Sequence, residues 1–153
     1  MEFALNRCAC TASAADDSYS LKKLGELRIV LAYLWISLGA IVGASARYFV
    51  SRFVAKAVTA SFPYGTLLIN ITGSFILGLF LVWSTERVLA DPRWRLLIAI
   101  GFCGSYTTFS SYAFESFSLF EQGHYLLFTW NVLANNVLCL AGVVAGAVIA
   151  RSI

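Results

Sequence analysis

Four long stretches of this chain contain no charged residue, and polar or charged segments separate them. The stretches run from 29 to 46, 57 to 85, 96 to 114 and 122 to 150. Each can hold a helix of about 20 residues, which is the length that spans the hydrocarbon core of a bilayer. We therefore expect an all-α polytopic membrane protein with four transmembrane helices. They should lie near residues 31–52, 64–85, 95–119 and 125–150.

The third stretch has an unusual composition for a transmembrane helix. Residues 101–115 read GFCGSYTTFSSYAFE, so Gly, Ser and Thr stand where Leu and Val are expected. In hydrocarbon, an unpaired backbone group is tolerated only where protein or a water-filled path surrounds it. The pattern predicts a break in the third helix and an ion or solute site beside it.

The first 28 residues are polar, mixed in charge, and lack an apolar stretch long enough for a signal peptide. We expect residues 1–28 to be an extension that is disordered or weakly helical, or the result of a start assigned too far upstream. The four-helix domain then covers residues 29–153.

Composition agrees with a membrane protein and excludes other classes. The chain is 59% hydrophobic and 12% charged, with a mean hydropathy of +0.78. We expect lipid around it and no nucleic-acid partner. It has neither a nucleophile–base pair nor a metal-ligand cluster, and its one histidine, His124, starts the last helix. An enzyme is therefore not expected.

The charges flanking the helices give no clear orientation. If both termini are cytoplasmic, the inside carries four arginines, and the outside carries Arg47, Arg52 and Lys56. The positive-inside rule then has little to act on, so insertion in both orientations, and an antiparallel dimer, are open. Fixation of the amino terminus by Lys22, Lys23 and Arg28 is the alternative.

Small residues predict where helices meet closely. Gly39 and Gly43 form a GxxxG motif in the first helix, and Gly142 and Gly146 form another in the fourth. Close backbone approach at such residues drives helix association in lipid, so the motifs indicate tight packing and allow a dimer.

Several amides lie within the predicted spans. Asn70 follows Thr66 by one turn, and its amide can donate to an anion while its oxygen stays bound to protein. A structural hydrogen bond between helices is the alternative, and the residues alone favour it. Asn131, Asn135 and Asn136 add three amides to the last helix.

The third helix offers hydroxyls and aromatic rings. Phe109 and Tyr112 are three residues apart, so both rings should share a face, and the positive edge of a ring can approach an anion. Glu115 should lie near an interface or have a partner. A path lined by neutral donors suits a small, strongly hydrated anion.

Three segments carry a specific resemblance. GAIVGASARY, PYGTLLINITGSFILG and GFCGSYTTFSSYAFE, in this order, resemble the three motif blocks of the Fluc fluoride channel family, also called CrcB. The resemblance implies a dual-topology antiparallel homodimer in the cell inner (plasma) membrane, or a heterodimer of paralogous subunits. It also implies a channel that passes fluoride passively out of the cytoplasm and so lowers its toxicity.

The resemblance further implies roles for individual residues. Backbone carbonyls of Gly104 and Thr107, with their symmetry mates, would hold a structural sodium ion (Na+) at the dimer centre. The anion pore would include Asn70, Phe109, Tyr112, Thr108, Ser110 and Asn135.

Three positions depart from the pattern typical of the resembled family. Tyr112 stands where the family commonly has Phe, and Asn131 and Asn135 stand where Tyr and Ser are typical. Arg47 ends the first block and would have a structural or an ion-attracting role.

Two other functions remain as alternatives. A small four-helix dual-topology multidrug transporter needs a membrane-embedded acid in the first helix, and residues 29–46 contain none. A non-transporting membrane subunit would explain the GxxxG motifs but would leave the polar faces of the second and third helices without a purpose.

Overall fold

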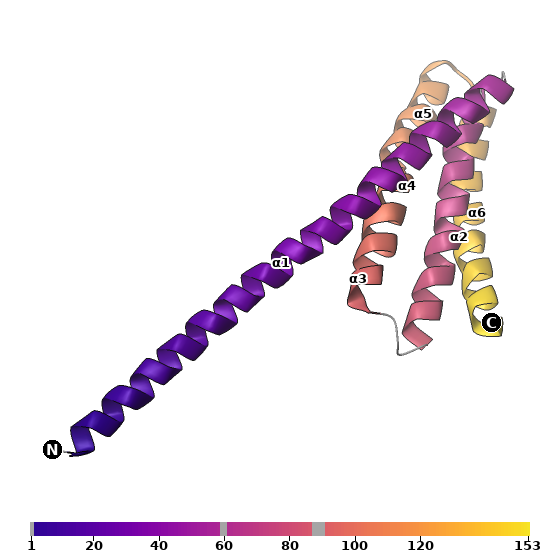
Figure 1. The fold of residues 1–153 in the computed structure, drawn as a ribbon. Coiled ribbons are helices and arrows are strands. Elements are labelled where there is room, and N and C mark those ends of the chain that lie inside the picture. The colour runs from indigo at the N-terminus through magenta and orange to yellow at the C-terminus, as the bar shows by residue number, and fades with distance from the viewer. Residues whose placement is uncertain (1, 59–60, 87–90) are drawn as a thin grey trace. The chain divides into compact units, whose positions relative to one another are not determined.

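The computed structural model describes residues 2–58, 61–86 and 91–153, with side chains from residue 22 onward. Within these ranges it contains helices and no strand, so the all-α prediction is confirmed (Figure 1). The long helices are α1 (Glu2–Ala57), α2 (Tyr64–Glu86) and α6 (Tyr125–Ser152). Shorter elements lie between α2 and α6, namely α3 (Pro92–Trp94), η1 (Arg95–Cys103), α4 (Gly104–Tyr106) and α5 (Phe109–Glu121).

The chain divides into two units, residues 1–34 and residues 35–153. The first unit is helical from Glu2, so the extension that we expected to be disordered or weakly helical forms the start of α1. That its start is assigned too far upstream stays a prediction. The second unit contains all the predicted site residues.

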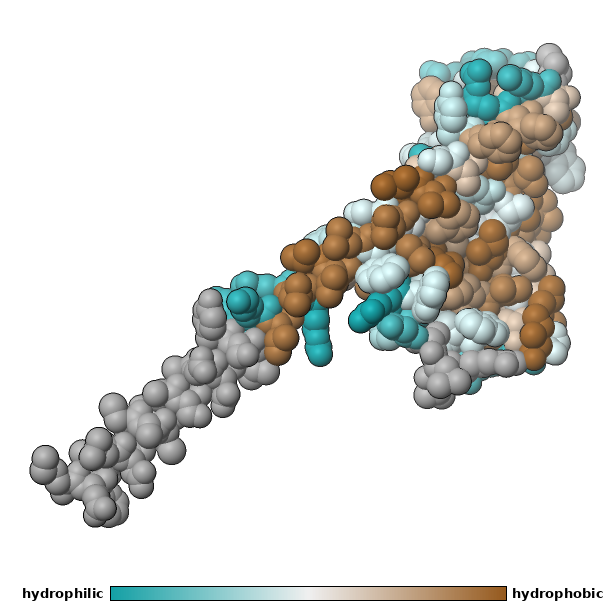
Figure 2. Space-filling view, in the orientation of Figure 1, coloured by the Kyte–Doolittle hydropathy of each residue, from teal (hydrophilic) through white to brown (hydrophobic). Residues whose placement is uncertain are grey.

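Three helices among the described residues are long and apolar enough to cross a membrane, namely Lys22–Ala57, Tyr64–Glu86 and Tyr125–Ser152. Large apolar side chains such as Phe49, Phe53 and Leu126 lie exposed on them. Figure 2 shows hydrophobic residues over much of the face in view. Because such a surface is stable in lipid and costly in water, this is a membrane protein.

The predicted third span, 95–119, is not one helix. It is divided among η1, α4 and α5, with α3 just before it, and none of these pieces reaches the length of a span. The nine residues of η1 form a π-helix. Irregular helix of this kind is common at functional sites.

Glycine contacts bring the helices together within the chain. A Cβ on Gly146 would overlap the Phe75 carbonyl of α2, and a Cβ on Gly78 would overlap the Val143 carbonyl of α6. Similarly, Gly39 of α1 lies against the backbone of η1, where a Cβ on Gly101 would come within 2.9 Å of the Gly39 Cα. The predicted close packing is confirmed, and both GxxxG motifs are used inside one subunit.

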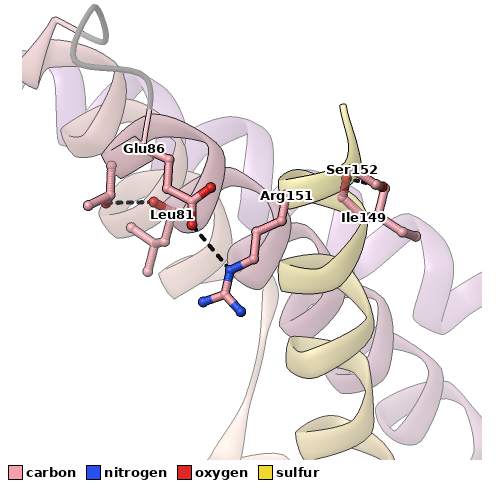
Figure 3. Close-up of polar contacts among 6 residues, drawn as sticks. Leu81, Glu86, Ile149, Arg151 and Ser152 are labelled. Atoms are coloured by element: carbon pink, nitrogen blue, oxygen red, sulfur yellow. Dashed lines mark hydrogen bonds and ion pairs between the residues drawn. The ribbon is translucent and has the colours of Figure 1, made fainter.

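An ion pair joins the ends of α2 and α6. Arg151 Nε donates to Glu86 Oε1 at 3.1 Å, and Figure 3 shows the two side chains reaching toward each other. Both side chains are exposed, so the pair adds little stability and mainly marks where the two helices end together.

Candidate functional site: a polar pocket beside a broken helix

The helix breaks at Thr107 and Thr108. Both residues have extended backbone, with φ −74° and ψ 155° at Thr107 and φ −147° and ψ 111° at Thr108. The Thr108 side chain then begins α5 by accepting a hydrogen bond from the Ser111 N–H at 3.1 Å. The predicted break is confirmed, and it is two residues long.

Asn70 of α2 binds both backbone groups of Thr108. The Thr108 N–H donates to Asn70 Oδ1 at 2.9 Å, and Asn70 Nδ2 donates to the Thr108 carbonyl at 3.2 Å. Thr108 is buried, and its N–H does not donate to the Gly104 carbonyl as it would in an unbroken helix, so without the amide this donor would be left unpaired. The Thr108 carbonyl, at the N-cap of α5, accepts the first bond of that helix and accepts from Asn70 as well. Asn70 therefore replaces the acceptor that the Thr108 N–H lacks and holds the same residue through a second bond.

Two amides of α6 extend the series of hydrogen bonds that begins at Asn70. Its Nδ2 also donates to Asn135 Oδ1 at 3.0 Å, and Asn135 Nδ2 donates to Asn131 Oδ1 at 2.9 Å. Asn131 Nδ2 donates to Ser116 Oγ at 2.9 Å, and Ser116 Oγ donates to the Tyr112 carbonyl at 2.7 Å. The chain of hydrogen bonds begins at the break and ends in α5. Every link in it is satisfied.

A pocket of about 300 Å³ opens beside the break. Of the six residues predicted for the anion pore, five line it, namely Asn70, Thr108, Phe109, Tyr112 and Asn135. The sixth, Ser110, has its hydroxyl 3.3 Å from Thr108 Oγ1. The structure therefore brings the predicted residues from three helices to one place, and no acidic side chain lines the pocket.

The two aromatic rings meet as predicted. The centroids of Phe109 and Tyr112 are 5.4 Å apart, with the ring planes at 62°, so the edge of one ring faces the other. The Phe109 side chain is 79% exposed in the single chain, while the Tyr112 hydroxyl accepts a long hydrogen bond of 3.4 Å from Asn136 Nδ2. One ring is thus free to contact a ligand or another copy.

The break also releases carbonyl groups, among them those of Gly104 and Thr107. In an unbroken helix the Gly104 carbonyl would accept from the Thr108 N–H, and the Thr107 carbonyl would accept from the Ser111 N–H. Those donors bind Asn70 Oδ1 and Thr108 Oγ1 instead. Carbonyl oxygens without donors are the ligands that hard cations prefer, so the residues predicted for sodium have suitable chemistry.

A second pocket, of about 360 Å³, is lined by Thr66 and Glu115 together with the end of α1. Thr66 Oγ1 donates to Glu115 Oε1 at 2.7 Å, so Glu115 has a partner, as expected. Its other oxygen, Oε2, is buried and has no partner among the described residues. Such a group is costly and typically marks a place for a ligand or water.

Arg47 lies partly exposed on α1 and lines neither polar pocket. Within the described part of the chain, ion pairs join Arg93 to Asp91 and Arg151 to Glu86, and none involves Arg47. Its structural or ion-attracting role stays a prediction.

Sequence reasoning missed the contribution of Ser116. A serine in a helix usually bonds its own turn, and Ser116 does donate to the Tyr112 carbonyl. Its second role, as acceptor from Asn131, joins residues of different helices. The only signal for it was a small polar residue one turn after Tyr112.

A helical membrane protein with a polar pocket beside an interrupted helix has the architecture of a channel or transporter, in which irregular backbone lines a path. The family described as "CrcB-like protein, Camphor Resistance (CrcB)" matches residues 34–147. The chain belongs to this family, and the resemblance of the three motif blocks is confirmed.

Individual relatives agree with this assignment. The "Fluoride-specific ion channel FluC" of Koribacter versatilis (strain Ellin345) is 70% identical over 121 residues, which cover 79% of this chain and 96% of that protein. A protein of the same name from Sulfurihydrogenibium sp. (strain YO3AOP1) is 43% identical over 119 residues, with coverage of 78% and 96%. These are names of channels and not of enzymes, in agreement with the expectation that this chain is not an enzyme.

Proposed function

We propose that this protein is a passive, fluoride-selective ion channel that lets fluoride leave the cytoplasm and so lowers its toxicity. The observation that carries the proposal is the pocket beside the break, where neutral donors and aromatic edges converge without an acidic side chain. Membership of a family whose relatives are named fluoride channels supports the same function.

The chemistry of the pocket favours a small anion. Fluoride must exchange the hydrogen bonds of its hydration shell for protein donors if it is to pass without a large barrier. The hydroxyls of Ser110 and Tyr112 and the first turn of α5 supply such donors, and the positive end of that helix favours negative charge. The edge of the Phe109 ring adds a weak positive surface.

A second copy of the chain would complete the channel. We propose four membrane spans, with η1 to α5 as the broken third span, and an antiparallel dual-topology homodimer in the cell inner (plasma) membrane. The 79% exposure of Phe109 and the exposure of Gly104 support a partner beside the break. A heterodimer with a paralogous chain would use the same surface.

Sodium is proposed as a structural ion at the same place. The Gly104 and Thr107 carbonyls would hold it, and two ligands from one chain are fewer than a hard cation takes, which favours a shared site between two copies. A bound ion would supply a fixed positive charge near the break.

The alternatives explain fewer of these features. A multidrug transporter needs an exchangeable acid in the first span, and residues 29–46 have none. A non-transporting subunit gives no reason for a polar pocket at membrane depth, where buried polar groups are costly.

The proposal is tested with purified protein in liposomes loaded with potassium fluoride, with a potassium ionophore to balance charge. We expect rapid fluoride release at equal pH on both sides and little release of chloride from matched liposomes. A channel moves no protons with fluoride, whereas a proton-coupled transporter would change the pH inside the liposomes as fluoride leaves. Absence of fluoride release from liposomes shown to contain folded protein would overturn the proposal.

A further inference from the structure

Asn131 is the most deeply buried polar residue in the described part of the chain, at 0% exposure, yet it does not line the pocket. It lies one helical turn before Asn135, which does line it. A buried amide must have hydrogen-bond partners for both its oxygen and its nitrogen, so the partners of Asn131 indicate its role at the site.

The hydrogen bonds between the break and Ser116 run in one direction. Thr108 offers one donor and one acceptor of fixed identity, so that contact favours one orientation of the Asn70 amide. The second hydrogen of Asn70 Nδ2 then requires an oxygen from Asn135. Each amide thereby fixes the orientation of the next, and an amide in the reverse orientation would place two donors or two acceptors together.

Asn131 connects this series of amides to the backbone of α6 and to Ser116 of α5. Its Oδ1 and its backbone carbonyl both accept from Asn135 Nδ2, at 2.9 and 3.1 Å. Its Nδ2 donates to Ser116, whose own hydrogen goes to a backbone carbonyl of α5. With Asn131 in place, Asn135 can present only its oxygen to Asn70.

The consequence for Asn70 follows from counting its hydrogens. Both hydrogens of Nδ2 donate to protein, one to Thr108 and one to Asn135, and its oxygen accepts from Thr108. No donor of Asn70 is left for an anion in this arrangement. Its contribution to the pocket is to hold the break, so that the hydroxyls and rings of α5 face the path.

We propose that Asn131 is a positioning residue, which acts through Asn135 to fix the Asn70 amide that holds the break in its extended conformation. This inference rests on the proposed channel function for its effect on fluoride, but the contact itself can be tested without fluoride.

The first measurement is hydrogen exchange at the backbone of residues 104–111 in the full-length protein. In Asn131→Leu, the Thr108 amide should exchange about tenfold faster or more, because the Asn70 amide that holds the break loses its support from α6 and the break opens more readily. Asn70→Ala should give at least the same increase. Thr129→Val on the exposed side of α6, which removes a hydroxyl bonded only to its own helix, should leave exchange unchanged. Wild-type exchange in Asn131→Leu overturns the inference.

The second measurement is the unitary fluoride current of single channels in a planar bilayer. If Asn131 holds the break in its conformation, each Asn131→Leu channel should carry a smaller current. If the substitution only impairs folding of the protein, fewer channels should be seen, each with the wild-type current. Fewer channels with the wild-type current would overturn the positioning role.

Two further outcomes are distinguishable. If Asn131→Leu does not insert into the membrane, Ser116→Ala tests the same series of hydrogen bonds, because it removes the oxygen that accepts from Asn131. Unchanged exchange of the Thr108 amide in Ser116→Ala would also overturn the inference. Should the wild-type protein carry no fluoride, the proposed function fails, and the exchange result alone decides whether Asn131 positions Asn70.

Discussion

At the scale of single residues, Asn70 and Phe109 line the same pocket but differ in exposure and in their contacts. Asn70 is 9% exposed, donates both hydrogens of its amide to protein and accepts one bond at its oxygen. Phe109 is 79% exposed and contacts Tyr112 by an aromatic edge. The first residue stabilises the backbone, and the second is free to meet an anion. A substitution of Phe109 therefore tests function with little effect on the fold of the subunit.

We expect Phe109→Ile to reduce fluoride flux by about tenfold or more, because an aliphatic side chain has no positive edge to offer an anion. The measurement is fluoride release from liposomes that contain equal amounts of dimeric protein. Phe114→Ile is the matched control, since Phe114 lies on the same helix, is 72% exposed and does not line the pocket. Equal flux in both variants would show that the ring of Phe109 has no part in the path.

At the scale of elements, the central feature is the break between α4 and α5. Its position was predictable from residues 101–115 because Gly, Ser and Thr weaken a helix wherever they gather. The predicted spans 64–85 and 125–150 agree with α2 and α6 to within two residues at each end. The π-helix of η1 was not, because Gly101 there lies against Gly39 of another helix, and that contact comes from packing.

The site was predictable in its members but not in its connections. Asn70, Phe109 and Tyr112 could be selected because polar and aromatic residues at membrane depth need a reason. Which partner each amide binds depends on helices that are distant in sequence, and the orientation of an amide depends on all of its partners at once. The roles of Asn131 and Ser116 therefore emerged only from the folded chain.

The contact between α2 and α6 gives a prediction at this scale. We expect Gly146→Leu to destabilise the protein by about 1–3 kcal/mol or more, because the added side chain meets the backbone of Phe75 and Leu79, which cannot move aside cheaply. Thermal unfolding in detergent measures the effect. Ala145→Leu adds similar bulk at an exposed position of the same helix and should change stability little. An unchanged unfolding temperature in Gly146→Leu would contradict the packing.

At the scale of the whole molecule, the apolar surface and the distribution of charged residues decide how the chain can insert into a membrane. The long helices expose apolar side chains broadly. In the proposed four-span topology, the basic residues outside 1–28 number four on one side and three on the other. A chain with so small a bias has little reason to prefer one orientation. That balance is the basis for proposing an antiparallel dimer.

We expect a reporter fused after Ile153 to be found on both sides of the membrane in comparable amounts. Two lysines inserted between Ile153 and the reporter should enrich the cytoplasmic orientation, because added positive charge is retained inside. Two serines at the same place serve as the control. A reporter found on one side alone in the unmodified chain would rule out dual insertion.

The one-way order of the amides also restricts which side chains can stand at positions 131 and 135 of this chain. Each position needs a group that accepts from one neighbour and donates to the next. An amide does this through two atoms of fixed identity, whereas a hydroxyl does it through one atom. A hydroxyl at either position could therefore continue the order, and an apolar side chain would leave a buried donor or acceptor unmatched. The direction of the bonds, and not the amide group itself, is what the site requires.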